Sequence, residues 1–279
     1  MNKRCLICNS AYKNKYDVLL KCTKCGFITT DLEISNDEIK KIYTADYFHG
    51  NEYADYINDK AIIQKNFYFR LKTLLKYLDN SDLKKLFEIG CAYGFFLELA
   101  SVKFKKVDGI DISNDAVEYI KKNQSLNISS GDFLEYQFTE KFDVFCMWDT
   151  IEHLKEPHLF IKKISENINS GGLIAFTTGD VGSLNAKIRG RYWRQIHPPV
   201  HLHYFNKKSL KILLQNYGFK VKYIGHPGSY FSLYNIFYII LVLKREKMGL
   251  FNLIEKTGIL NKMIYLNLYD LVYVIAEKE

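Results

Sequence analysis

Short apolar segments recur from residue 83 onward and alternate with longer segments of helical pattern. A continuous apolar run such as Val144 to Trp148 is typical of a strand buried on both faces, as in a parallel sheet. Seven strands alternating with helices predict an α/β fold with a doubly wound sheet. The expected strands are Leu83–Ile89, Lys106–Ile112, one before Gly131, Val144–Trp148, Leu173–Thr178, Phe219–Ile224 and Leu271–Ala276.

The sharpest change of pattern is the stretch LFEIGCAYGFFLELA, Leu86 to Ala100, where an apolar strand turns into a helix. Gly90 and Gly94 allow a tight turn and a close backbone approach to a ligand. A carboxylate at Glu88, just before this turn, would repel the phosphates of a dinucleotide. It suits a cationic, phosphate-free ligand such as S-adenosylmethionine, which carries an ammonium and a sulfonium group. The junction is therefore predicted to bind that cofactor.

The same stretch resembles the first motif of the class I S-adenosylmethionine-dependent methyltransferases, (D/E)-x-G-x-G-x-G, with Ala92 in place of the middle glycine. Three later segments are similar to further motifs of this family and follow in the same order: Lys106–Ile112, Ser130–Phe133 and Val144–Leu154. This order favours the family over isolated helix caps or loop acids. The resemblance implies a Rossmann-like seven-stranded sheet whose last two strands are antiparallel. It also implies that the cofactor is bound by Glu88, Gly90, Ala92, Gly94, Asp111, Ile112, Asp132, Phe133 and Trp148.

Four cysteines near the start of the chain form two Cys-x2-Cys pairs, Cys5 with Cys8 and Cys22 with Cys25. Four thiolates at this spacing can converge tetrahedrally on zinc, and Gly26 would relieve the turn after the second pair. Because a closed shell of four cysteines leaves no position for water or substrate, this zinc is predicted to be structural. Two disulfides are disfavoured without a signal peptide, and a redox-active Cys-x2-Cys would not come as a pair.

We therefore expect three parts: a zinc ribbon at residues 1–35, a linker and lid helix at 36–80, and a methyltransferase domain at 81–279. The middle part has a dense group of aromatic residues before a helix predicted at Ile57–Leu78. Tyr47 or Tyr56 is expected to close over the cofactor, with packing against the sheet as the alternative.

Residues 192–205 contain three histidines, two prolines and four aromatic residues. Imidazole can take a proton near neutral pH, and a methyl acceptor must lose one when it attacks the sulfonium carbon. The string from His201 to Phe205 resembles sugar-related methyltransferases that also carry an N-terminal zinc module. This resemblance implies His201 as the base, although Val200 stands where the sugar C-methyltransferases among them have glutamate. Substrate contacts are expected from Glu152, Trp193, His203 and Tyr204.

His153 is the alternative base, since it lies beside Glu152 and one helical turn from Asp149. These three residues resemble a motif of some quinone-pathway O-methyltransferases, which implies a divalent ion that orients a hydroxyl. Proximity alone is a third alternative, because a bound sulfonium is reactive once it is aligned. His197 is expected to be structural.

The net charge of +8 comes from lysines scattered along the chain rather than from one arginine-rich block. A solvated lysine-rich surface explains such a charge better than a nucleic-acid partner does. Tyr230–Leu243 is a run of 14 uncharged residues, shorter than the roughly 20 that span a bilayer. We expect this run to be a buried helix or a wall of the substrate pocket, with interfacial membrane contact as the alternative.

Together these patterns predict a cytoplasmic S-adenosylmethionine-dependent methyltransferase with a structural zinc ribbon. The expected acceptor is a small molecule, a hydroxyl of a nucleotide-linked or polysaccharide-precursor sugar. One alternative is metal-assisted O-methylation of a quinone or phenolic lipid. The other is an RNA-binding or RNA-modifying module, which salt-dependent RNA binding would reveal. The sequence predicts no oligomeric state.

Overall fold

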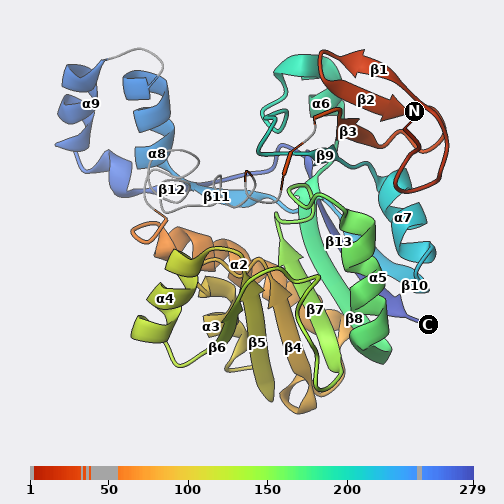
Figure 1. Ribbon diagram of the computed structural model, residues 1–279. Helices are drawn as coiled ribbons and strands as arrows, with labels where there is room; N and C mark the ends of the chain where they lie inside the picture. Colours follow the sequence, from red (N-terminus) through yellow and green to blue (C-terminus); the bar gives the residue numbers. More distant parts are fainter. Residues whose placement is uncertain (1–2, 33, 36–37, 39–55, 244–246) are drawn as a thin grey trace.

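The computed structural model describes residues 3–32, 34–35, 38, 56–243 and 247–279. Its centre is a sheet of seven strands in the order β10-β13-β8-β7-β4-β5-β6 (Figure 1). The run from β6 to β8 is parallel, whereas β13 is antiparallel to both β8 and β10. The predicted α/β sheet with an antiparallel final pair is therefore confirmed. Its strands are β4 (Lys85–Ile89), β5 (Lys106–Asp111), β6 (Asn127–Ser130), β7 (Phe142–Trp148), β8 (Ile168–Gly179), β10 (Phe219–Gly225) and β13 (Leu271–Lys278).

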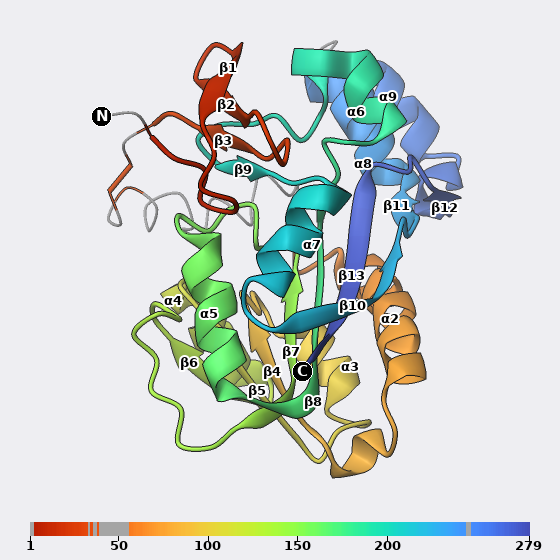
Figure 2. The ribbon, with the colours of Figure 1, turned by 90° about the vertical axis from the view of Figure 1, so that its right-hand side faces the viewer.

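Helices cover both faces of this sheet (Figure 2). Successive strand residues face opposite sides, so each face has its own core. Leu86 and Val144 contribute to the core beneath α2, α3 and α4, while their neighbours Phe87 and Phe145 contribute to the core beneath α5 and α7. The helices are α2 (Lys60–Leu74), α3 (Phe95–Ala100), α4 (Asn114–Asn123), α5 (Pro157–Asn167) and α7 (Lys207–Gln215).

The N-terminal residues form a second, four-stranded sheet that is completed by a distant segment. Its strands β1 (Tyr12–Tyr16), β2 (Leu19–Cys22) and β3 (Ile28–Thr30) are joined by β9 (His203–Tyr204). The partners across the last pair are Ile28 with Tyr204 and Thr29 with His203. The N-terminal module therefore shares its sheet with the histidine-containing segment 192–205. The helix α6 (Leu184–Arg189) and a turn of 3-10 helix at Gly190–Tyr192 lead into this segment.

An insertion between β10 and β13, residues 229–266, forms a projection that we call the arm (Figure 1). Its own small core lies around Leu241, Phe251 and Leu260. The prediction of one helix over Tyr230–Leu243 is wrong at its start, because Tyr230 lies in a strand that pairs with Tyr265. In the described part of the chain, no helix is long and apolar enough to cross a membrane. The elements of the arm are β11 (Ser229–Ser232), α8 (Leu233–Phe237), a π-helix at Tyr238–Leu243, α9 (Met248–Glu255), a 3-10 turn at Ile259–Asn261 and β12 (Met263–Leu266).

Candidate active site

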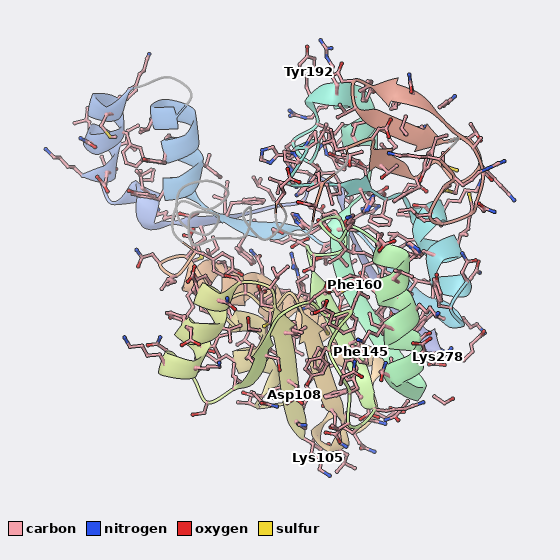
Figure 3. The ribbon with its side chains drawn as sticks, in the orientation of Figure 1. Lys105, Asp108, Phe145, Phe160, Tyr192 and Lys278 are labelled. Carbon is pink, nitrogen blue, oxygen red and sulfur yellow. The ribbon has the colours of Figure 1, made fainter. Side chains whose placement is uncertain are left out.

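A cavity of about 270 Å³ opens at the carboxyl ends of the parallel strands. Its walls include Glu88 from β4, Asp111 from β5 and Trp148 from β7, together with Asp132 from the loop after β6. In Figure 3, Lys105 lies just before β5, at the amino ends of the parallel strands. Phe160, which lines the cavity, lies nearer to their carboxyl ends. Ligands of open parallel sheets bind at this end, so the cavity is the candidate site.

The turn between β4 and α3 has the backbone that its glycines predict. Gly90 and Gly94 have φ angles of +72° and +71°, and Ala92, in the position of a motif glycine, has φ of +44°. A Cβ atom on Gly90 would lie 2.7 Å from Cγ2 of Thr150, so this site lacks both the space and the backbone angle for a side chain. Gly94 does not line the cavity but precedes the first residue of α3.

Two acids lie on the cavity wall next to this turn. Glu88 is 2 % exposed, and its Oε2 atom has no hydrogen-bond partner among the described residues. Burial, with the charge of Asp111 beside it, raises the pKa of Glu88 well above its usual value. Asp111 accepts hydrogen bonds from the backbone N–H groups of Ala92, at 2.7 Å, and Ser113, at 2.8 Å. Asp111 therefore fixes the turn, while Glu88 is a buried acceptor turned toward the cavity.

Aromatic side chains supply the apolar walls. Phe133 stacks on Phe160 with ring centroids 5.2 Å apart, and Tyr56 stacks on Phe95 at 5.4 Å. The indole Nε1 of Trp148 is buried and has no hydrogen-bond partner in the part of the chain that the structure describes. A buried donor or acceptor without a partner costs about 1–3 kcal/mol, so a ligand that bonds Trp148 and Glu88 would recover that cost. Tyr47, the other predicted lid residue, lies outside the described residues.

Comparison with known proteins agrees with this geometry. A family model described as a methyltransferase domain matches residues 60–224, more than half of the chain. The chain belongs to this methyltransferase family. The match runs from α2 through β10 and so includes every strand that lines the cavity.

Relatives and solved structures of the methyltransferase are distant. The malonyl-[acyl-carrier protein] O-methyltransferase of Calditerrivibrio nitroreducens is 27% identical over 126 residues, 45% of this chain and 50% of the relative. The mitochondrial ubiquinone biosynthesis O-methyltransferase of Schizosaccharomyces pombe is 29% identical over 103 residues, 34% of this chain and 38% of the relative. The chain thus spans half or less of these relatives.

Two solved structures share the fold. One is an S-adenosylmethionine-dependent methyltransferase from Archaeoglobus fulgidus, with a TM-score of 0.54 and 18% identity over 80% of this chain and 99% of that chain. The other is such an enzyme from Clostridium acetobutylicum, with a TM-score of 0.52 and 11% identity over 80% and 96%.

Both histidines predicted as bases in the methyltransferase lie together, with His153 on the loop between β7 and α5, residues 149–156, which we call the cavity loop. The rings of His153 and His201 meet edge to face with centroids 4.6 Å apart, and His153 lines the cavity. Nδ1 of His153 lies 2.9 Å from the carbonyl oxygen of Val200, and Nδ1 of His201 lies 2.8 Å from that of Gln195. A carbonyl oxygen only accepts, so the neutral ring of His201 carries its proton on Nδ1 and its lone pair on Nε2. The ring of His153 has a second backbone contact, with Asp149.

The histidine pair has a buried carboxyl beside it. Ligand atoms of Glu152, His153 and His201 all lie within 4.8 Å of one another. Burial and the nearby charge of Asp149 raise the pKa of Glu152 to about 8. Asp149 is not part of this group, because its carboxylate accepts from the Thr177 hydroxyl at 2.9 Å and pairs with an arginine. The structure thus groups His201, rather than the predicted Asp149, with Glu152 and His153.

Three predicted substrate residues are turned away from the cavity in the described structure. Trp193 is 1 % exposed and donates its indole N–H to Asp270 at 2.9 Å. His203 is buried between Oγ1 of Thr29, 3.0 Å from Nδ1, and the backbone of the cavity loop. Tyr204 is buried and donates its hydroxyl to the carbonyl oxygen of His201. These contacts assign the three side chains to the scaffold around the site rather than to its surface.

Arg70 is a site residue that the sequence analysis missed. Its guanidinium pairs with Asp149 at 2.9 Å and lies over the rings of Phe67 and Trp148, with a side chain that is only 10% exposed. The positive charge also opposes the rise in the pKa of Glu88. An arginine in the lysine-containing sequence of α2 carries no local signal of this role, because its partners Asp149 and Trp148 lie at and after the end of a distant strand.

Replacing Arg70 should loosen the cavity loop. Asp149 has a φ angle of +51°, which is costly for a non-glycine residue, and the ion pair helps to hold it there. We expect Arg70→Gln to lower affinity for S-adenosylmethionine roughly tenfold, about 1.4 kcal/mol, measured by calorimetry. Lys72→Gln, on the same helix, is the matched control and should bind normally. Unchanged affinity in Arg70→Gln would show that the pair does not support the site.

The four N-terminal cysteines converge on one point. Sγ of Cys5 lies 3.6 Å from Sγ of Cys25, and Sγ of Cys8 lies 3.4 Å from that of Cys22. All four sulfur atoms lie within 4.8 Å of one another, and none is in a disulfide. Tetrahedral zinc with bonds of about 2.3 Å separates its sulfur ligands by roughly 3.8 Å, so the arrangement fits zinc. Gly26, with φ of +75°, makes the predicted turn after the last cysteine.

Proposed function

We propose that this methyltransferase binds S-adenosylmethionine in the cavity and transfers its methyl group to a hydroxyl of a small acceptor. Glu88 would accept from the ammonium group of the cofactor, and Asp111, which keeps lone pairs beyond its two backbone bonds, would accept from the ribose hydroxyls. Asp132 and Phe133 would hold the adenine. The sulfonium supplies an activated methyl group, and the protein aligns the acceptor with it.

The observation that carries the hydroxyl as acceptor is the histidine pair. Burial lowers the pKa of both His153 and His201, so both rings are neutral at physiological pH and can receive a proton. Because Nδ1 of His201 bonds the carbonyl oxygen of Gln195, the basic atom of that ring is Nε2. We propose that this pair receives the acceptor proton, with His153 on the cavity wall and His201 packed against it.

The proposed acceptor is a nucleotide-linked or polysaccharide-precursor sugar. This rests on the resemblance of the His201–Phe205 string and of the four-cysteine module to sugar-related methyltransferases. The exposed Lys155, which lines the cavity, would supply a cation for a phosphate of such a substrate. We also propose structural zinc at the four cysteines, and a cytoplasmic location, because thiols remain reduced there.

Calorimetry with Glu88→Gln and Asp111→Asn tests the cofactor assignment. Both substitutions keep the size of the side chain but replace one acceptor oxygen, which would accept from the ammonium or the ribose, with an NH2 donor. We expect micromolar binding of S-adenosylmethionine to the native protein and at least about a thirtyfold loss in each variant, roughly 2 kcal/mol. Glu98→Gln, in the neighbouring α3, should bind normally. Native, zinc-loaded protein that does not bind the cofactor would reject the proposed function.

A second candidate function is metal-assisted O-methylation of a quinone or phenolic lipid. The observation that favours it is the group of Glu152, His153 and His201, which together offer one carboxylate and two imidazole ligands. The Nδ1 contacts to carbonyl oxygens are also typical of metal-bound histidines. Transfer that requires an added divalent ion, and that Glu152→Gln abolishes while zinc is retained, would select this function over the metal-free one.

A further inference from the structure

Exposed apolar side chains gather on two elements that the proposed active site does not use. On α6 and the turn after it, Leu184, Ile188 and Tyr192 are 73%, 76% and 74% exposed. Their spacing of four residues places Leu184 and Ile188 on one helix face, and Figure 3 shows Tyr192 at the edge of the molecule. Single exposed apolar residues are normal on a protein surface, but a row of three this exposed is not.

The second set lies on the arm. Leu250 and Leu253 on α9 are 44% and 64% exposed, and Ile259 in the turn after α9 is 47% exposed. The opposite side of α9 is occupied, since Phe251 is buried against Tyr234 and Tyr238. The outer face of α9 is therefore apolar although the inner face already provides the core of the arm.

Both sets are accompanied by cations. Lys187, Arg189 and Arg191 are exposed among the apolar residues of α6, and residues 181–205 contain no aspartate or glutamate. On the arm, the exposed Lys256 and Lys262 flank Ile259. Aliphatic side chains interspersed with lysine and arginine are complementary to a surface that has anionic groups above an apolar layer.

The position of the two sets identifies the shape of the partner. In both views α6 and α9 lie in the upper part of the molecule, above the sheet, and Figure 1 shows them on opposite sides of it (Figures 1 and 2). A broad surface can contact both, whereas a single helix in a groove would contact only one. RNA would engage the arginines but offers no burial for Leu184 and Ile188, since single-stranded nucleic acid is bound by aromatic stacking.

We propose that the protein binds peripherally to an anionic lipid bilayer through α6 and the arm. The apolar residues enter the boundary between headgroups and acyl chains, and the lysine and arginine side chains contact the lipid phosphates. The bilayer then lies at the end of the sheet that carries the cavity.

Vesicle flotation tests this proposal with full-length, zinc-loaded protein. Vesicles of phosphatidylcholine and phosphatidylglycerol in equal parts should bind it, and vesicles of phosphatidylcholine alone should bind it much more weakly. Leu184→Ser/Ile188→Ser should lower the partition coefficient roughly tenfold or more, and Leu250→Ser/Leu253→Ser should do likewise. Lys187→Gln/Arg189→Gln/Arg191→Gln should lower the partition coefficient by a similar factor. High salt should weaken binding of the native protein to the level of this variant.

The matched control is Leu83→Ser/Val102→Ser, which removes two apolar side chains that are 65% and 76% exposed outside both sets. It should bind anionic vesicles as the native protein does. Calorimetry with S-adenosylmethionine verifies that each variant is folded. Native protein that does not float with anionic vesicles overturns the proposal, as do serine variants that float normally. The proposal is also overturned if sedimentation velocity shows a dimer that Leu184→Ser/Ile188→Ser dissociates, which would make a second copy of the chain the partner. Binding of RNA that is lost in the same variant would instead make RNA the partner.

Discussion

Gly90→Ala is expected to lower affinity for S-adenosylmethionine at least about a hundredfold, roughly 2.7 kcal/mol. Two effects act together. The φ angle of +72° is costly for alanine, by about 1–2 kcal/mol, and the added methyl group would lie 2.7 and 2.8 Å from Cγ2 and Oγ1 of Thr150. Thr150 cannot easily move away, because its hydroxyl donates to the carbonyl oxygen of Trp148 at 3.1 Å. The cavity wall must therefore shift.

Two variants separate these effects. Gly171 has a similar φ of +73° but nothing within 4 Å of an added Cβ, and it lies outside the cavity. Gly171→Ala should therefore lose about 1 kcal/mol of unfolding free energy and keep full affinity. Thr150→Ala introduced beside Gly90→Ala removes both close atoms and should restore part of the binding. Native affinity in Gly90→Ala would mean that the cofactor does not approach this turn.

The central sheet is predictable because its signals are local. Leu86 and Phe87 face opposite cores, so the strand must be apolar at consecutive positions. The arm is not predictable in this way. Its first strand exists because Tyr230 pairs with Tyr265 far along the chain, and Tyr230 also exchanges backbone hydrogen bonds with the side chain of Asn66 on α2. An apolar run that lacks a clear period fits a helix and a strand equally well, so its long-range partners determine which of the two it forms.

The same distinction applies to the site. Glu88 and Gly90 lie within one turn, so their spacing indicates a ligand site before the fold is known. The histidines of the 192–205 segment share residue type and neighbourhood, yet His201 packs on His153 while His203 bonds Thr29 of the ribbon. Which histidine of this segment packs against His153 depends on the pairing of β9 with β3, and nothing local to either segment encodes that pairing.

That pairing connects the four-cysteine module to the segment that carries the proposed base His201. Cys25 and Phe27 lead directly into β3, and the carbonyl oxygen of Cys25 accepts a hydrogen bond from Asn206 at 3.1 Å. Across the pair, His203 contacts the carbonyl oxygen of Lys155 on the cavity loop at 3.2 Å, and its backbone N–H donates to that of Glu152 at 3.0 Å. The position of the His153 and His201 pair therefore depends on an ordered ribbon.

Removal of zinc, by Cys25→Ser or by chelation, is accordingly expected to affect catalysis more than cofactor binding. Structural zinc supplies most of the folding energy of such small modules, so β3 should lose its order and β9 its partner. We expect kcat to fall at least about a hundredfold, while affinity for S-adenosylmethionine changes less than about fivefold, because Glu88, Asp111 and Trp148, proposed to hold the cofactor, lie on strands of the larger sheet. Zinc content and calorimetry are measured on the same samples.

Thr29→Val isolates the link without removing zinc. It deletes the hydroxyl that lies 3.0 Å from Nδ1 of His203 and leaves the four cysteines untouched. We expect zinc content to be unchanged and kcat to fall about tenfold, the effect of one buried hydrogen bond on the placement of the base. Since zinc stays bound, general unfolding of the ribbon cannot explain that loss. Zinc-free protein with a native kcat would show that the sheet shared by β3 and β9 stabilises the fold without positioning the histidines.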